Sequence, residues 1–406
     1  MLRSKLIAFA IFLMVQVCQV EALGSLRSKA NPNRLRSRSI WTKMNRDQIK
    51  AEYTGPAPTT FETRLDHFNN SEGMANQTFA LRYIIDEQYN QNKSGPILFY
   101  AGNEGDVEAF YNNSGFMTTT LAQRMNATVV FGEHRYYGES FPFNNRTVAM
   151  QRENLKYLSV EQVMMDYVTL LESIKANGSY DQNTQDLNPR TPIYVFGGSY
   201  GGMLATWLRM KYPATFHGAI ASSAPILWFY GSVDPHAYDQ ITDYSARLLQ
   251  NDPNVKDSMC VTVYQRAFYD LIQATNVNST YENITKEFNV CPDSPITTPQ
   301  QVEMLAEMVA DNIGGMAMVN YPYPTNFLNP LPAWPLNASC NNASFVRSEP
   351  QAANETLNFN FENIKKLAAM NFIWQGSDCI FLEPSVTTME EELELQGALD
   401  GRAWEI

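Results

Sequence analysis

The sequence predicts an α/β fold with a mostly parallel sheet, followed by a mainly helical part. As far as about residue 225, short apolar runs alternate with segments of helical spacing, which is the pattern of strands joined by helical crossovers. After that point long helical spacings mix with Pro-rich loops, and no short apolar run is obvious over a long stretch. With 44 % hydrophobic and 18 % charged residues among 406, the chain is neither disordered, coiled-coil nor collagen-like.

The elements of the sheet part follow in order. Thr78 to Ile85 alternates as a strand, and four short apolar runs predict further strands: 96–100 and 128–131, which are interpreted as buried, then 193–196 and 218–221. Between them, helical spacing predicts helices over 116–125, 158–174 and 203–212, and Ser159 with Gln162 forms a candidate capping box. Because parallel strands need crossover connections, these helices should cover both faces of the sheet.

The remaining helices and the segment boundaries complete the expected organisation. Helices are predicted over 238–249, 261–274 and 302–308. We expect a signal peptide over 1–22, a leader or propeptide-like segment over 23–55, the sheet part over 56–225 and the helical part over 226–406.

The N-terminus has the pattern of a secretory signal peptide. Arg3 and Lys5 precede an apolar run over 6–17, and Val20 and Ala22 are small residues suited to a cleavage site. A retained signal anchor is the alternative, but the run is shorter than the ~20 residues that a spanning helix needs. We therefore expect entry into the secretory pathway and no membrane segment after signal removal.

Glycosylation sequons and cysteines agree with that compartment. Twelve Asn-x-Ser/Thr sequons occur, at Asn69, Asn76, Asn92, Asn112, Asn126, Asn145, Asn177, Asn278, Asn283, Asn337, Asn342 and Asn354. Once Cys18 leaves with the signal peptide, four cysteines remain: Cys260, Cys291, Cys340 and Cys379. They predict two disulfides with three possible pairings. A zinc site is the rival interpretation, which the long spacings and the lack of a nearby His disfavour.

The charge distribution excludes one class of partner. The formal net charge is −12, and residues 1–50 hold ten Lys/Arg and two Asp/Glu, so the remainder carries 20 positive against 40 negative side chains. Such an acidic body repels phosphate backbones, which argues against nucleic-acid binding. It suits an acidic compartment, where many carboxylates are partly neutralised.

One motif carries the chemistry. Residues 197–201 read Gly-Gly-Ser-Tyr-Gly, a Gly-x-Ser-x-Gly element between a predicted strand and a predicted helix. In that context the serine is a nucleophile held above the sheet by a turn too tight for flanking side chains; a glycine-rich turn with an idle serine is the alternative. Ser199 is the candidate nucleophile. The backbone N–H of Tyr200 and the loop that starts at Gly102 are the candidate oxyanion donors.

Three stretches resemble a known family. Residues 197–202 (GGSYGG), 102–106 (GNEGD) and 133–140 (EHRYYGES) are similar to the prolylcarboxypeptidase and dipeptidyl peptidase II family of serine peptidases, and Arg64 to Phe68 (RLDHF) matches too. The resemblance implies an α/β-hydrolase core, a helical cap domain, a lysosomal or extracellular location and exopeptidase cleavage after proline at acid pH. It implies peptide substrates with proline at the cleaved position. No metal or cofactor is implied, since serine acyl transfer needs none.

The catalytic base is not identified by the sequence. Hydrolase order is Ser, then Asp or Glu, then His, yet the chain has four histidines, His67, His134, His217 and His236, and only the last two follow Ser199. Glu133 and His134 match a motif that is expected to shape its loop, and His217 is expected to be a packing residue beside a strand. Asp378 follows an apolar run but has no later histidine to orient.

The resemblance implies that the family's Asp and His come from a C-terminal part of the core, and we expect this part to be missing from this chain. Three functions therefore remain open: a proline-specific serine exopeptidase, a catalytically inactive binding or regulatory protein, and another α/β-hydrolase such as an esterase or lipase. The sequence leaves open whether a relative removes a C-terminal residue or an N-terminal dipeptide, and whether the chain forms a homodimer.

Overall fold

A computed structural model of the chain describes residue 50 and residues 53–91, 94–176, 191–227, 260–327, 329–344 and 359–382. These residues form two compact units, a sheet unit up to residue 227 and a helical unit from residue 260. The predicted signal peptide, most of the leader, the predicted helix at 238–249 and His236 lie outside the described residues.

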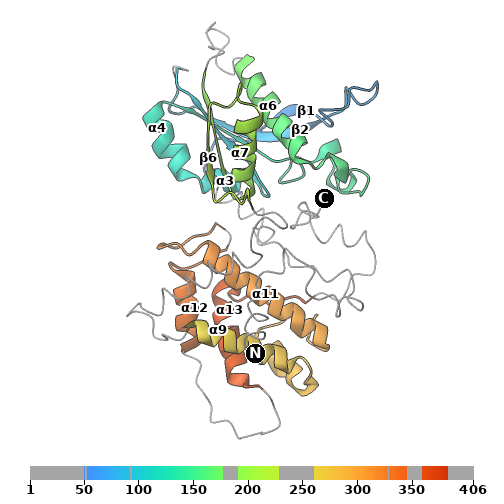
Figure 1. The fold of residues 1–406 in the computed structure, drawn as a ribbon, viewed down its shortest axis with the longest axis vertical. Coiled ribbons are helices and arrows are strands. Elements are labelled where there is room, and N and C mark those ends of the chain that lie inside the picture. Colours follow the sequence, from blue (N-terminus) through green and yellow to red (C-terminus); the bar gives the residue numbers. More distant parts are fainter. Residues whose placement is uncertain are drawn as a thin grey trace. The chain divides into compact units, whose positions relative to one another are not determined.

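The sheet unit holds a mixed sheet of six strands among the described residues, in the order β1-β2-β4-β3-β5-β6 (Figure 1). The strands are β1 (Thr59–Arg64), β2 (Thr78–Asp86), β3 (Ile97–Ala101), β4 (Thr128–Gly132), β5 (Ile193–Gly198) and β6 (Gly218–Ser222). The helices are α3 (Val107–Asn112), η3 (Phe116–Leu121), α4 (Ala122–Met125), η4 (Pro142–Asn144), α5 (Arg146–Ala149), η5 (Leu155–Tyr157), α6 (Val160–Ala176) and α7 (Tyr200–Lys211). The four predicted strands are confirmed as β3 to β6, and they pair in parallel. β3, β4 and β5 are largely buried, whereas β6 is largely exposed.

Two antiparallel pairings extend the sheet beyond the predicted parallel part. β2 pairs antiparallel with both β1 and β4. The sequence does not predict β1, because most of its side chains are exposed or half-buried and the alternation of apolar and polar residues is therefore weak.

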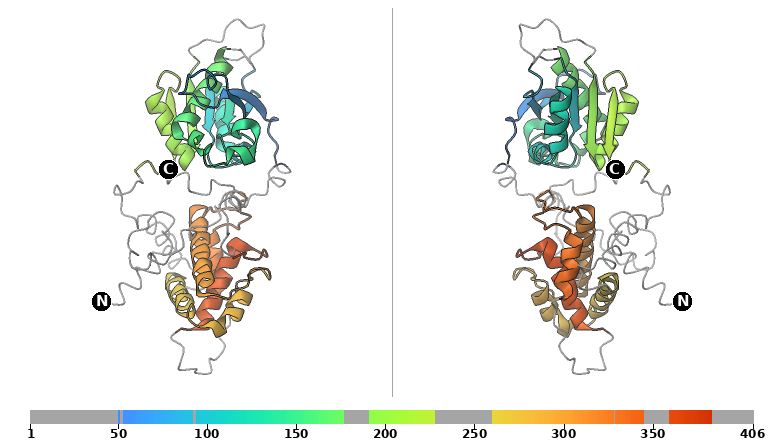
Figure 2. Two further views of the ribbon diagram at one scale, coloured as in Figure 1. Left: turned by 90° about the vertical axis from the view of Figure 1, so that its right-hand side faces the viewer. Right: turned by 90° about the vertical axis from the view of Figure 1, so that its left-hand side faces the viewer.

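Helices lie on both faces of the sheet (Figures 1 and 2), and the contacts of alternate β3 side chains assign each helix to a face. Ile97, Phe99 and Ala101 belong to one buried cluster with the apolar faces of α6 and α7. The intervening Tyr100 stacks on Phe110 of α3, at 5.7 Å between ring centroids. Since successive strand residues point to opposite faces, α6 and α7 cover one face and α3 packs on the other.

The predicted capping box at the start of α6 is only half formed. The N–H of Gln162 lies 3.3 Å from the Ser159 hydroxyl, as expected. The Gln162 side chain, however, donates to Asp66 at 2.7 Å and accepts from the His67 N–H at 2.9 Å. The prediction of a reciprocal capping bond was therefore wrong, because these tertiary partners use the amide group that the cap would need.

The helical unit packs its longer helices around one apolar core (Figure 1). Its elements are α9 (Cys260–Ala274), η7 (Asn278–Thr280), α10 (Tyr281–Glu287), α11 (Pro299–Met318), α12 (Pro335–Ser344) and α13 (Phe361–Gln375). α11 is much longer than predicted, and Thr298 and Gln301 form a true capping box at its start. Where α11 meets α13, a Cβ added to Gly315 would lie 2.6 Å from the Trp374 ring, so the glycine permits this close contact.

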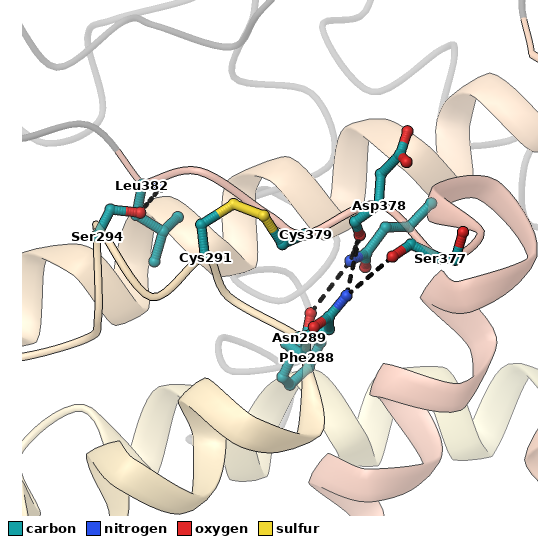
Figure 3. Close-up of a disulfide and its surroundings, with 9 residues drawn as sticks. Phe288, Asn289, Cys291, Ser294, Ser377, Asp378, Cys379 and Leu382 are labelled. Atoms are coloured by element: carbon teal, nitrogen blue, oxygen red, sulfur yellow. Dashed lines mark hydrogen bonds between the residues drawn. A yellow bond between two sulfur atoms is a disulfide. The ribbon is translucent and has the colours of Figure 1, made fainter.

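A disulfide ties the end of this unit to its middle (Figure 3). Cys291 bonds Cys379 across a sequence separation of 88 residues. Beside it, the Asn289 side chain donates to the carbonyls of Ser377 and Asp378, each at 3.2 Å. Cys340 is also disulfide-bonded, while the side chain of Cys260 lies outside the description. The expectation that these cysteines form disulfides is confirmed for Cys291, Cys340 and Cys379.

None of the helices in the described ranges combines the length and apolar character that a membrane-crossing helix needs. Within the same ranges, no group of three or more His, Cys, Asp or Glu side chains is arranged to hold a metal ion.

Candidate active site

Ser199 occupies a strained turn between β5 and α7. Its backbone has φ 55° and ψ −124°, a conformation that an L residue rarely adopts. Its N–H donates to the Ser222 carbonyl of the neighbouring β6 at 3.0 Å, which holds the turn in place. The residue is exposed while Tyr200 beside it is buried, so the hydroxyl is accessible to a ligand. Backbone strain of about 1–3 kcal/mol persists only where the surroundings enforce it, and it is concentrated at functional sites.

The glycines around Ser199 are required by close backbone contacts. A Cβ on Gly197 would lie 1.9 Å from the Gly201 carbonyl oxygen, and one on Gly201 would lie 2.7 Å from the Ala101 carbonyl oxygen of β3. A Cβ on Gly202 would lie 2.9 Å from the Ser222 carbonyl oxygen. The turn is therefore as tight as the motif predicts, and it brings the start of α7 against two strands.

Tyr200 is the first residue of α7, so its N–H lies next to Ser199 at the positive end of the helix dipole. The second candidate for an oxyanion donor is the loop that starts at Gly102, after β3, but the N–H of Gly102 itself is already hydrogen-bonded. Its N–H bonds the Gly132 carbonyl at 3.0 Å as an extension of the sheet, and the Gly105 N–H bonds the Asn103 carbonyl at 2.8 Å. The loop itself is held by the Tyr167 hydroxyl, which donates to the Gly102 carbonyl at 2.7 Å.

The side chain of Tyr200 meets His134, which follows β4. The Tyr200 hydroxyl lies 3.0 Å from Nε2 of His134, and Nδ1 of His134 lies 2.6 Å from the Arg135 carbonyl oxygen. Burial lowers the pKa of His134 to about 4, so the ring is neutral above that pH. As a candidate base, His134 thus has both ring nitrogens in contact with groups other than Ser199.

Glu133 joins the loops that follow β3 and β4. Its buried carboxylate accepts from the Arg82 guanidinium at 2.6 Å, from the Val107 N–H at 3.1 Å and from the Ser140 hydroxyl at 2.8 Å. Burial raises its pKa to about 7, and the positive charge of Arg82 opposes that rise. The position of Glu133 agrees with the expectation that the EHRYYGES stretch shapes this region.

The RLDHF stretch is tied to the same loop by a second buried ion pair. Asp166 of α6 accepts from Arg135 at 2.6 Å and is 2.7 Å from Nε2 of His67. Thr63 donates to the same carboxylate at 2.8 Å. His67 is thus part of a buried anchor between β1, α6 and the loop after β4.

The other residues considered for the triad do not complete it among the described residues. His217 precedes β6 and its Nδ1 accepts from the Ile193 N–H at 3.2 Å. It is exposed, so the expectation of a packing role was wrong: β6 at this edge leaves its side chains largely uncovered. Asp378 is exposed and lies in the helical unit beside the disulfide (Figure 3).

The described sequon asparagines differ in exposure. Seven are exposed: Asn69, Asn76, Asn112, Asn126, Asn145, Asn278 and Asn283. Asn337 and Asn342 are half-buried, and Nδ2 of Asn342 donates to the Ala369 carbonyl at 2.5 Å. Asn92, Asn177 and Asn354 lie outside the described residues.

Comparison with known proteins places the whole set of motifs in one family. The sequence pattern of the family described as serine carboxypeptidase S28 matches residues 63–404. Human lysosomal Pro-X carboxypeptidase is 35 % identical over 321 residues, covering 79 % of this chain and 58 % of the human protein. Putative serine protease pcp-1 of Caenorhabditis elegans is 35 % identical over 369 residues, covering 87 % of this chain and 60 % of that protein. The chain thus spans about three fifths of the length of these relatives.

Similarity to solved structures is weaker. Proline iminopeptidase of Mycobacterium smegmatis is 10 % identical with a TM-score of 0.31, over 86 % of this chain and 98 % of that one. The mixed sheet and the strained serine turn have the α/β-hydrolase architecture. With a family match over most of its length and these relatives, the chain belongs to the serine carboxypeptidase S28 family.

Proposed function

We propose that this chain is a serine exopeptidase that cleaves peptide bonds after proline, with Ser199 as its nucleophile. The strained, exposed turn at Ser199 is the observation that carries the proposal, because that conformation is costly and presents the hydroxyl to solvent. The substrate class follows from the relatives, several of which are named lysosomal Pro-X carboxypeptidase. These names favour removal of a C-terminal residue over removal of an N-terminal dipeptide.

The geometry supports a standard acyl-transfer sequence. The Ser199 oxygen attacks the carbonyl carbon of the proline residue, and a base accepts the hydroxyl proton. The carbonyl oxygen becomes an oxyanion, which the N–H groups of Tyr200 and Asn103 would stabilise. We assign Asn103 because the other N–H groups of the loop are already used: Gly102 donates to Gly132 of β4, Gly105 donates to Asn103, and the Glu104 N–H bonds its own carboxylate. The leaving amine takes the proton from the base, and water then hydrolyses the acyl-enzyme.

The base has no assigned residue in the described part of the chain. None of the three histidines described there is hydrogen-bonded to Ser199: His134 bonds Tyr200, His67 bonds Asp166, and His217 bonds the Ile193 N–H. This observation favours a second candidate function, that of a protein that binds proline-containing peptides without hydrolysing them.

The proposed setting is the secretory pathway, with a lysosomal or extracellular destination. The lysosomal relatives, the signal-like N-terminus and the exposed sequon asparagines support it. Peptides are the proposed partners, and a homodimer is left open.

Peptide hydrolysis by the secreted, glycosylated 406-residue chain tests the proposal. An N-blocked peptide ending in Pro-Phe and a free-amine dipeptide amide ending in proline are compared between pH 4.5 and 7.5, with Ser199→Ala as the matched control. The proposal predicts release of Phe from the first peptide, abolished by Ser199→Ala. Saturable binding of the same peptide without release would favour the binding protein, and cleavage of a short acyl ester alone would reject both.

A further inference from the structure

A buried contact links the residue after the nucleophile to a second strand of the sheet. Tyr200 is 9 % exposed and His134 is 1 % exposed, with 5.5 Å between their ring centroids. The only polar atom of the Tyr200 side chain, its hydroxyl, is 3.0 Å from Nε2 of His134. The two residues are 66 positions apart in the sequence, so the contact is a product of the fold.

The chemistry of this contact sets the direction of its hydrogen bond. A carbonyl oxygen can only accept, so the short contact between Nδ1 of His134 and the Arg135 carbonyl requires the proton on Nδ1. In the neutral ring Nε2 then carries a lone pair, and the Tyr200 hydroxyl donates to it. Burial keeps His134 neutral above about pH 4, although Asp166 favours the charged ring and Arg135 opposes it. Tyr137 packs edge-on against the His134 ring, with 5.1 Å between the ring centroids.

The bond matters because Tyr200 also carries a proposed oxyanion donor. The anchored side chain and the N–H belong to one residue, so holding the phenol restricts the peptide that joins Ser199 to Tyr200. That peptide follows a strained residue, and strained backbone relaxes wherever its surroundings loosen. The backbone also restrains the turn, because the Ser199 N–H donates to the Ser222 carbonyl and the Ser199 carbonyl accepts from the Met203 N–H at 3.1 Å. The side-chain bond of Tyr200 adds a restraint from a different strand.

Resting on the proposed serine-peptidase function, we propose that His134 is a positioning residue that holds Tyr200 and so fixes the oxyanion donor beside Ser199. His134 does not touch the reacting atoms in this role. It acts through the Tyr200 hydroxyl. The EHRYYGES stretch thereby supports the backbone of the GGSYGG stretch.

Three variants separate this role from simple packing. Tyr200→Phe removes the donor oxygen alone, and His134→Phe removes the acceptor. His134→Gln is the conservative variant, because its side-chain oxygen can accept near the position of Nε2. Tyr281→Phe is the matched control: Tyr281 is 4 % exposed in the helical unit and its hydroxyl donates to the Thr275 carbonyl at 2.6 Å.

Hydrogen-exchange mass spectrometry on a peptide covering residues 197–203 is the first measurement, because it needs no catalytic activity. Exchange at the turn should rise about tenfold in Tyr200→Phe and His134→Phe, and stay near the wild-type rate in His134→Gln and Tyr281→Phe. In hydrolysis assays kcat should fall about tenfold in the first two variants, with KM within about twofold, since losing one oxyanion donor outright typically costs 10²–10³ in kcat.

The outcomes distinguish the two proposals. Unchanged exchange at residues 197–203 in both Phe variants, or a raised KM with unchanged kcat, overturns the positioning role while leaving peptidase activity intact. A wild-type chain that hydrolyses nothing rejects the proposed function, and the exchange measurement then still decides whether His134 holds the turn. If His134→Phe fails to fold, Tyr200→Phe, which deletes a single oxygen, gives the answer.

Discussion

Replacing Glu133 with glutamine should change how the stability of the sheet unit depends on pH. Burial raises the pKa of Glu133 from its ordinary 4.5 to about 7. Burial lowers the pKa of the neighbouring His134 from its ordinary 6.5 to about 4. The folded state therefore holds the Glu133 proton more tightly than the unfolded state does, and it disfavours the protonated His134 ring.

The two residues act in opposite directions. The contribution of Glu133 to stability is complete below about pH 4.5 and is lost as the pH rises to about 7. The contribution of His134 is complete above about pH 6.5 and is lost as the pH falls to about 4. Each shift is about 2.5 pKa units, which at 1.36 kcal/mol per unit corresponds to about 3 kcal/mol. Between pH 4.5 and 6.5 one contribution falls with pH as the other rises, so these two groups give the wild type almost no net pH dependence of stability.

Glu133→Gln removes the contribution of Glu133 and leaves the pH dependence that is due to His134. Between pH 6.5 and 4.5, which covers most of the shift, the variant should lose about 2 kcal/mol more stability than wild type, whatever its stability at neutral pH. Urea titrations read by hydrogen exchange on peptides from β3 and β5 report on the sheet unit alone. His134→Gln should show the opposite difference over the same range. Parallel pH profiles for wild type and both variants would refute the reasoning.

Four further predictions rest on other parts of the structure. Ser199→Gly should be about 1 kcal/mol more stable than Ser199→Ala in urea titrations, because glycine adopts a positive φ without strain. Equal unfolding midpoints for the two variants would contradict the claim that the backbone at Ser199 is strained. Gly102→Ala should lose about 1–3 kcal/mol, because its Cβ would lie 2.2 Å from the Gly132 carbonyl oxygen, whereas Gly115→Ala, with nothing within 4 Å of its Cβ, should be close to wild type in the same titration. Cys291→Ala should lower the stability of the helical unit by up to about 4–5 kcal/mol, the loop entropy of an 88-residue separation, measured on α9 and α13 peptides; an unchanged midpoint would contradict it. Glycopeptide mapping should find Asn126 and Asn283 occupied and Asn342 empty, because the Asn342 amide is bonded to Ala369; a glycan on Asn342 would contradict the packing of α12 on α13.

Local sequence patterns were enough for the centre of the sheet. The apolar runs of β3, β4 and β5 are buried and short, so composition alone marks them. β1 escaped because its exposed threonines and glutamate do not alternate with apolar residues. α11 was predicted too short although Thr298, Pro299 and Gln301 carry the signals of a helix start.

The candidate active site likewise has a part that the sequence predicts and a part that it does not. Ser199 and its glycines follow from a motif of five adjacent residues, so the turn could be predicted from the sequence. The bonds of Glu133 to Arg82 and of His134 to Tyr200 join residues 51 and 66 positions apart. No local pattern encodes them, since they depend on strand order and register. The use of the Gly102 N–H by the sheet is likewise visible only once β3 and β4 are paired.

Covalent labelling of Ser199 tests the central claim most directly. The secreted chain is treated with a fluorophosphonate probe at pH 5 and 7, and the modified residue is mapped by mass spectrometry with Ser199→Ala as control. The account predicts one phosphonylated serine, Ser199, and no labelling of the control. A folded, monodisperse protein that remains unlabelled, or that is labelled equally in Ser199→Ala, would contradict the assignment of Ser199 as the nucleophile.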